Sequence, residues 1–215
     1  MPRRQTPLVN NEFYNIFNRG VEKRSIYTNT WDYKRFLKSC YYYQFLGPKP
    51  SLSKFVKSDL GLFQPLAENK MVEIICYCFM PNHFHLLIRQ LKDRGASLFL
   101  GQLLNSYTKY FNTKYSRIGS LFQGTFKAVR METDEQLIHL SRYIHLNPIV
   151  SGLAANLELW PWSSYFEFMS KPNLCSITEI LSFFSSPEKY REFLKDQIDY
   201  GTTLEIIKHQ LIEKS

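Results

Sequence analysis

Two histidines separated by one hydrophobic residue form the most chemically suggestive pattern, His83-Phe84-His85. In a β-strand, residues i and i+2 project from the same face, so both imidazoles would point one way while Phe84 enters the opposite layer. Two neutral imidazoles that converge on one point suit a divalent metal ion with positions left open for substrate oxygens. A pair of this kind also occurs as the polar lining of a sheet face, so further residues are needed to indicate a metal site.

A second polar pattern lies on an expected helix that begins at Thr133, where Gln136 completes a capping box. Tyr143 and Asn147 are one helical turn apart, so this helix can place an amide ligand beside a phenol held for attack. Each has a structural interpretation too: Tyr143 as a cap over the core, and Asn147 as the last helical residue before Pro148. The polar rim beside the apolar stripe comprises Gln136, His139, Tyr143 and Asn147.

Two other tyrosines, Tyr107 and Tyr110, compete for the role of nucleophile. Tyr107 falls on the apolar stripe of its helix, which favours a place in the core. Tyr110 lies at the edge of that stripe and has no carboxamide one turn later. On the later helix His145 points away from Tyr143, so it receives no role, whereas His139 is expected to support the metal ligands from behind.

Hydrophobic periodicity predicts the elements that position these residues. Apolar runs and alternation predict strands over 12–19, 71–79, 83–90 and 121–131, and helical stripes predict helices over 31–43, 97–114 and 133–147. Pro81-Asn82 between the middle strands predicts a tight antiparallel hairpin. The order predicts an α+β fold, a ferredoxin-like antiparallel sheet with helices on one face and the other face open for a ligand.

The chain is long enough for one sizeable core, with 215 residues of which 44% are hydrophobic. Residues 1–160 are expected to form the catalytic domain, interrupted by a loop or insertion at about 47–70 that lacks periodicity and contains Gly61 and Pro65. Residues 161–215 are expected to form a helical C-terminal extension, with helical patterns over 177–184 and 188–198.

The charge balance indicates a polyanionic partner. Lys and Arg number 27 against 19 Asp and Glu, which gives a net charge of +8, and the basic residues are spread over the first two thirds of the chain rather than in a tail. A folded cationic surface favours nucleic acid over a membrane, and the 14 Tyr and 17 Phe supply rings that can stack on bases. Expected phosphate contacts are Arg19, Arg24, Lys109 and Lys127.

The cysteines predict a reduced protein, because none is spaced as C-x-x-C and two lie in an apolar run. We therefore expect buried free thiols and a cytoplasmic location. The N-terminal segment lacks the apolar core of a signal peptide, and no stretch approaches the about 18 apolar residues of a membrane span. The cysteines are Cys40, Cys76, Cys78 and Cys175.

Four strings in sequence order resemble the REP-associated tyrosine transposases, which belong to the single-strand nucleases named for a histidine-hydrophobe-histidine (HUH) motif. The similarity runs from about Phe13 to Tyr165. The segment at 47–70 is longer than a minimal family loop, and the extension after Trp162 is idiosyncratic. The strings are FNRG at 17–20, MPNHFHLLI at 80–88, GSLFQGTFKA at 119–128 and RYIHLNPIVSGL at 142–153.

The resemblance implies that His83 and His85 are paired metal ligands, Asn147 the third ligand and Tyr143 the nucleophile. It further implies a Mg²⁺ or Mn²⁺ ion, a single-stranded or hairpin DNA substrate, and cleavage through a 5′-phosphotyrosine. Two alternatives remain open: a non-catalytic ferredoxin-like nucleic-acid-binding module derived from a transposase, and a phosphodiesterase that uses activated water. Both a monomer and a homodimer remain possible.

Overall fold

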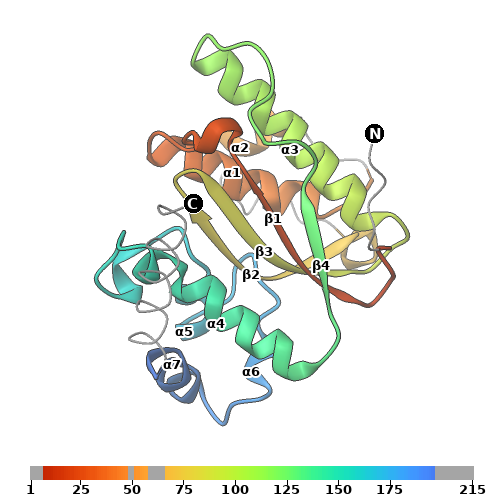
Figure 1. Cartoon of the computed structure of the whole chain (residues 1–215). Helices are drawn as coiled ribbons and strands as arrows, with labels where there is room; N and C mark the ends of the chain where they lie inside the picture. Colours follow the sequence, from red (N-terminus) through yellow and green to blue (C-terminus); the bar gives the residue numbers. More distant parts are fainter. Residues whose placement is uncertain (1–6, 48–50, 58–65, 197–215) are drawn as a thin grey trace.

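A four-stranded antiparallel sheet forms the centre of the protein. The computed structural model describes residues 7–47, 51–57 and 66–196. The strand order is β2-β3-β1-β4 (Figure 1), with each neighbouring pair antiparallel. This confirms the predicted α+β class and the single sheet. The strands are β1 (Phe13–Arg19), β2 (Val72–Met80), β3 (His83–Gln90) and β4 (Lys127–Met131).

Two long helices, α1 (Thr30–Tyr43) and α3 (Gly95–Lys114), cover one face of the sheet (Figure 1), as the helical stripes predict. The core beneath them is rich in aromatic and branched side chains, because alternate strand residues point into it. It includes Ile16, Phe84, Leu86, Leu103 and Tyr107, all fully buried.

The other face of the sheet is open over only part of its area, which corrects the expectation of a wholly open face. α4 (Asp134–Val150) and the C-terminal segment pack there in a second core that includes Ile75, Cys76 and Leu87. The reason is that β2 is apolar on both sides, so each side must be covered to exclude water. A register shift between Ile74 and Cys76 turns Ile75 into this second core.

The C-terminal segment that follows α4 contains short helices joined by loops. It contains η4 (Leu157–Leu159), α5 (Tyr165–Met169), α6 (Thr178–Leu181) and α7 (Pro187–Lys195). The two helical patterns expected at 177–184 and 188–198 correspond to α6 and α7, although residues 197–215 lie outside the described part. None of the helices in that part has the length and hydropathy needed to cross a bilayer.

The helix α4 continues beyond Asn147, so the expected stop there is wrong. Pro148 lies inside its last turn, where the missing N–H removes a single hydrogen bond. The carbonyls of that turn still find partners, because Ser151 N donates to Asn147 O at 3.0 Å and Leu153 N donates to Pro148 O at 2.8 Å. The helix ends instead before Gly152, whose φ of 67° suits glycine.

Two further boundaries differ from expectation. The last strand begins at Lys127 rather than at Leu121, because Leu121 and Phe122 are buried in the first core from a loop that turns at Gly124 with a φ of 67°. The expected loop at 47–70 contains a short helix, α2 (Leu52–Lys57), and one turn of 3₁₀ helix, η3 (Ala67–Asn69). All four cysteines are buried free thiols, as predicted.

Candidate active site

The histidine pair projects from β3 on the face turned away from α1 and α3. The alternate residues Phe84 and Leu86 lie in the core beneath those helices, so His83 and His85 point the other way. Their ring centroids are 5.2 Å apart and the planes are nearly perpendicular, at 88°. His85 is 7% exposed. The shared face predicted from the i, i+2 spacing is therefore confirmed.

The helix α4 places Tyr143 and Asn147 against this pair. The Tyr143 ring meets the His85 ring edge to face, with centroids 5.3 Å apart and planes at 90°. Asn147 lies one turn further along and is 7% exposed. Its amide is close enough to His83 to act on the pKa of that imidazole, although its Oδ1 does not meet the geometry of a hydrogen bond. Four residues singled out in the sequence thus meet at one place.

Burial keeps both imidazoles neutral at neutral pH. It lowers the pKa of His85 to about 3, and the neighbouring His83 acts in the same direction. The pKa of His83 is also lowered, first by burial, while the Asn147 amide opposes the shift and Arg19 adds to it. A neutral imidazole keeps a lone pair, which is the form that binds a metal ion.

Two buried atoms at this site lack a hydrogen-bond partner among the described residues, namely Nδ1 of His85 and Oδ1 of Asn147. Buried polar atoms are usually paired, so two unpaired atoms at one place are available to bind a ligand. No third His, Cys, Asp or Glu joins the histidines in the described ranges. Two imidazoles and one amide oxygen are therefore the donor set available, and this set fits a divalent cation with open positions.

Two neighbours that the sequence analysis did not select orient the histidines. The Oδ1 atom of Asn82 lies 2.7 Å from His83 Nδ1 and accepts a hydrogen bond from its N–H. The other ring nitrogen of His83 therefore keeps its lone pair. Phe17 is paired with His85 in the β1–β3 register, and the two rings stack with centroids 5.7 Å apart. The alternation along the strand that leads into FNRG, with Ile16 inward and Phe17 outward, is the signal that could have identified Phe17.

The hairpin turn that carries His83 is held by the loop after β1. Gly20 N donates to Asn82 O at 2.8 Å, and Ile26 N donates to Pro81 O at 2.8 Å. Glycine is required at position 20 because the loop folds back on itself there, and a Cβ would lie 2.2 Å from the Arg24 carbonyl oxygen.

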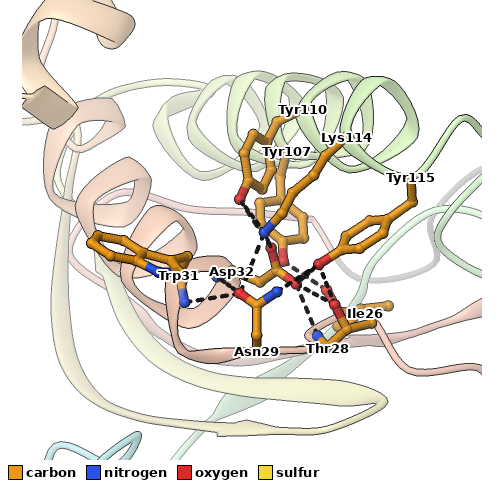
Figure 2. A network of polar contacts seen from close by, with 9 residues as sticks. All are labelled: Ile26, Thr28, Asn29, Trp31, Asp32, Tyr107, Tyr110, Lys114 and Tyr115. Atoms are coloured by element: carbon orange, nitrogen blue, oxygen red, sulfur yellow. Dashed lines mark hydrogen bonds and ion pairs between the residues drawn. The ribbon is translucent and has the colours of Figure 1, made fainter.

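The same loop is fastened to α1 and α3 by a polar cluster around buried Asp32 (Figure 2). The Asp32 carboxylate accepts from Lys114 Nζ at 2.6 Å and from Thr28 N at 2.9 Å. The hydroxyls of Tyr110 and Tyr115 also donate to it, at 2.9 and 2.7 Å. The turn of the histidine pair therefore rests on a braced loop.

The competing tyrosines lie on the other side of the sheet. Tyr107 is fully buried and donates to Ile26 O at 2.6 Å, and Tyr110 is engaged with Asp32 (Figure 2). Both belong to α3, which covers the face opposite His83 and His85. Neither hydroxyl faces the metal-ligand candidates.

A groove of about 660 Å³ opens beside His83. Two of the predicted DNA contacts, Arg19 and Lys127, line it, and Arg19 is held by a 2.8 Å hydrogen bond from Nε to Gln123 Oε1. Cationic side chains beside a candidate metal site suit a phosphate backbone. The lining residues are Phe17, Asn18, Arg19, Lys23, Asn82, His83, Gln123 and Lys127.

Three predicted contributors lie elsewhere. Lys109 is exposed on α3, which covers the opposite face of the sheet. Arg24 is engaged with Glu22 and with the Val21 carbonyl and is not among the groove-lining residues. His139 contacts the Phe193 ring of α7 at 5.8 Å and accepts from Arg142, so it does not support the metal ligands from behind. Helical spacing predicted His139 on the polar rim, but in the structure its ring packs against α7 instead.

Residues 48–147, which include all four site residues, match the family model for IS200-like transposases. A putative REP-associated tyrosine transposase from Haemophilus influenzae is 22% identical over 127 residues, which span 54% of this chain and 72% of that relative. A solved structure of a REP-associated tyrosine transposase bound to a REP hairpin has the same fold. It aligns with a TM-score of 0.56 and 15% identity over 82% of this chain and 90% of that one.

Over residues 48–147 the chain is therefore similar to the IS200-like transposases, and these matches support a transposase function. The resemblance to the REP-associated tyrosine transposases is confirmed, by the relative in sequence and by the solved structure in fold.

Proposed function

We propose that this protein is a metal-dependent single-stranded DNA endonuclease and transposase that forms a 5′-phosphotyrosine on Tyr143. The observation that carries the proposal is the meeting of Tyr143 with unpartnered, buried donor atoms of His85 and Asn147. A phenol, two neutral imidazoles and an amide oxygen are the groups that a tyrosine nuclease needs at one point.

The groove beside His83 is the proposed path of the DNA backbone. Arg19, Lys23 and Lys127 on its walls can neutralise phosphates, while the Phe17 ring can stack on a base. A single strand is the proposed substrate, because an unpaired backbone can bend into the groove and reach the residues beside His83. The hairpin bound by the solved relative suggests cleavage at hairpin-associated sites.

Within the site, a Mg²⁺ or Mn²⁺ ion held by His83, His85 and Asn147 would act as a Lewis acid on the non-bridging oxygens of the scissile phosphate. Tyr143 attacks that phosphorus through its phenol oxygen, whose ordinary pKa of about 10 makes it a poor nucleophile without positioning. Its side chain is 45% exposed, so the phenol proton can pass to solvent. The contact with His85 fixes the ring during attack.

The bond changes balance without an external energy source. The Tyr143 oxygen forms a bond to phosphorus, the bond from phosphorus to the 3′-oxygen breaks, and that oxygen takes up a proton to become a free 3′-hydroxyl. One phosphodiester replaces another, so a second 3′-hydroxyl can reverse the step and join a new strand.

Labelled single-stranded DNA hairpins incubated with the protein and Mg²⁺ or Mn²⁺ test this proposal. A denaturant-resistant protein–DNA adduct should form, disappear in Tyr143→Phe and persist in Tyr110→Phe, and peptide mapping should place it on Tyr143. Cleavage that survives Tyr143→Phe would instead support hydrolysis by activated water. Binding without any cleavage would support the non-catalytic module.

A further inference from the structure

His145 lies on α4 between the two residues that this helix contributes to the site. Successive helical residues differ by about 100°, so His145 faces away from Tyr143 and Asn147. It is 1% exposed. Its Nδ1 lies 2.8 Å from Tyr190 Oη, and its Nε2 lies 2.7 Å from Ser164 Oγ. Both partners belong to the C-terminal segment, which therefore contacts α4 beside the residues that α4 contributes to the site.

The hydrogen bonds of this network have one consistent direction. Ser141 Oγ donates to Ile138 O at 2.7 Å, so it accepts from the Tyr190 hydroxyl at 3.0 Å. Tyr190 in turn accepts from His145 Nδ1–H, and Nε2 remains to accept from the Ser164 hydroxyl, whose oxygen lies 2.7 Å from it and 3.2 Å from the alternative acceptor, Tyr77 O. We call Ser141, His145, Ser164 and Tyr190 the His145 network.

Ser164 connects the network to the sheet. Tyr77 N donates to Ser164 Oγ at 2.8 Å, and Ser164 N donates to Tyr77 O at 3.0 Å. Tyr77 lies on β2, which is paired with the strand that carries His83 and His85. Through His145, α4 is therefore fastened to the same sheet that holds the candidate metal ligands.

Next to this network α4 also packs against α7 (Figure 1). Tyr190 is fully buried, so its ring and its hydroxyl are both held. The Arg142 guanidinium lies 4.1 Å from the centre of the Phe193 ring and donates to Phe193 O at 3.4 Å. Contacts of α4 with both Ser164 and α7 oppose rotation of the helix about its axis.

A small rotation of α4 would matter for the reaction. A tyrosine hydroxyl lies roughly 8 Å from the axis of its helix, so a rotation of about 10° moves it by about 1.4 Å. Misplacement of a reacting group by about 1 Å can cost a factor of about 100 in rate.

We propose that the His145 network positions the nucleophile helix, by setting the rotation of α4 that aligns Tyr143 and Asn147 with His83 and His85. The inference rests on the proposed function and gives the C-terminal segment a part in the reaction, although the segment need not touch DNA. Its members act as positioning residues through α4.

Tyr190→Phe tests the inference with a single-atom change. The variant keeps the buried ring but removes the hydroxyl, so His145 Nδ1–H loses its acceptor. Tyr165→Phe is the matched control, because Tyr165 is 2% exposed in the same segment and bonds instead to Glu158 at 3.2 Å. Ser164→Ala removes the opposite end of the network and serves as a second variant.

We expect Tyr190→Phe and Ser164→Ala to lower the single-turnover rate of adduct formation by about 10- to 100-fold, with the Kd for single-stranded DNA within about twofold of wild type. Tyr165→Phe should leave the rate unchanged. An NMR measurement on selectively labelled protein gives a readout independent of activity. The nuclear Overhauser effect between the Tyr143 and His85 rings should weaken in Tyr190→Phe and persist in Tyr165→Phe.

An unchanged adduct rate and an unchanged Tyr143–His85 signal in Tyr190→Phe would overturn the inference, even if the variant melts at a lower temperature. If the wild-type protein forms no adduct at all, the proposed function fails, and the NMR comparison alone then decides whether the network positions α4.

Discussion

The rings of Tyr143 and His85 meet in a T-shaped contact, with centroids 5.3 Å apart and planes at 90°. This contact joins the nucleophile candidate on α4 to a ligand candidate on β3 through their rings, so it does not depend on the phenol oxygen. Chemistry and packing at this site can therefore be separated by substitution, and the following predictions use that separation.

Removal of one imidazole should abolish metal-supported cleavage without loss of DNA binding. His85→Ala takes away a buried donor atom, whereas affinity for DNA depends on many phosphate contacts. We expect adduct formation to fall by at least about 100-fold and calorimetric Mn²⁺ binding to be lost. His139→Ala, a histidine on α4 turned toward Phe193, is the control and should retain both activities. Equal loss of DNA binding in His85→Ala would indicate a structural role.

Asn147→Leu should abolish metal binding and raise the free energy of unfolding. Its buried Oδ1 has no partner in the described structure, and an unpaired buried polar atom costs about 1–3 kcal/mol. In the presence of EDTA, the free energy of unfolding should rise by about 1 kcal/mol relative to wild type. Added Mn²⁺ should raise the melting temperature of wild type but not of the variant. A variant less stable than wild type in EDTA would show that Asn147 supports the fold.

The groove predicts a specific salt dependence. Lys127 lines the groove beside His83 and Lys109 lies on the opposite face of the sheet. Lys127→Ala should lower the slope of log affinity against log salt for single-stranded DNA by about 0.7, the value for one phosphate contact on a single strand. Lys109→Ala should leave the slope unchanged. Fluorescence anisotropy titrations at several salt concentrations measure both, and equal effects would place the DNA elsewhere.

Asp32 should make stability depend on pH in acid. Burial acts to raise its pKa, but hydrogen bonds from Lys114, Thr28 and Tyr115 outweigh this and lower the pKa to about 2. Because the unfolded-state pKa is about 3.9, the unfolded chain binds the proton first as pH falls. The stabilising contribution of about 2–3 kcal/mol is thus present above about pH 4 and lost as the pH falls through about 2.

Urea unfolding of wild type and Asp32→Asn from pH 7 to pH 2.5 measures this contribution. The variant should be less stable at pH 7, and the difference between the two proteins should shrink between about pH 4 and pH 2. A difference that stays constant across this window would show that the carboxylate charge is not what Asp32 contributes.

Much of the candidate active site follows from local geometry. His83 and His85 share a face because a strand alternates, and Tyr143 and Asn147 share a face because a helix repeats every 3.6 residues. These rules need no tertiary contacts, so the sequence alone predicted both pairs. Pro148 shows the limit of a local rule, because the carbonyls of the last turn find partners in residues 151–154 and the helix continues past it.

The meeting of the two pairs was decided by the tertiary structure. Periodicity states which residues share a face but not which face lies against which, and that depends on how the apolar surfaces of distant elements are covered. β2 is apolar on both sides, so α4 and the C-terminal segment pack on the second face and exclude water from it. This packing brings Tyr143 into contact with His85. The same packing turns His139 toward α7 and buries His145 against Tyr190. These contacts join residues far apart in the sequence. Their stabilisation comes from apolar surface buried between distant elements, which a short stretch of sequence does not reveal.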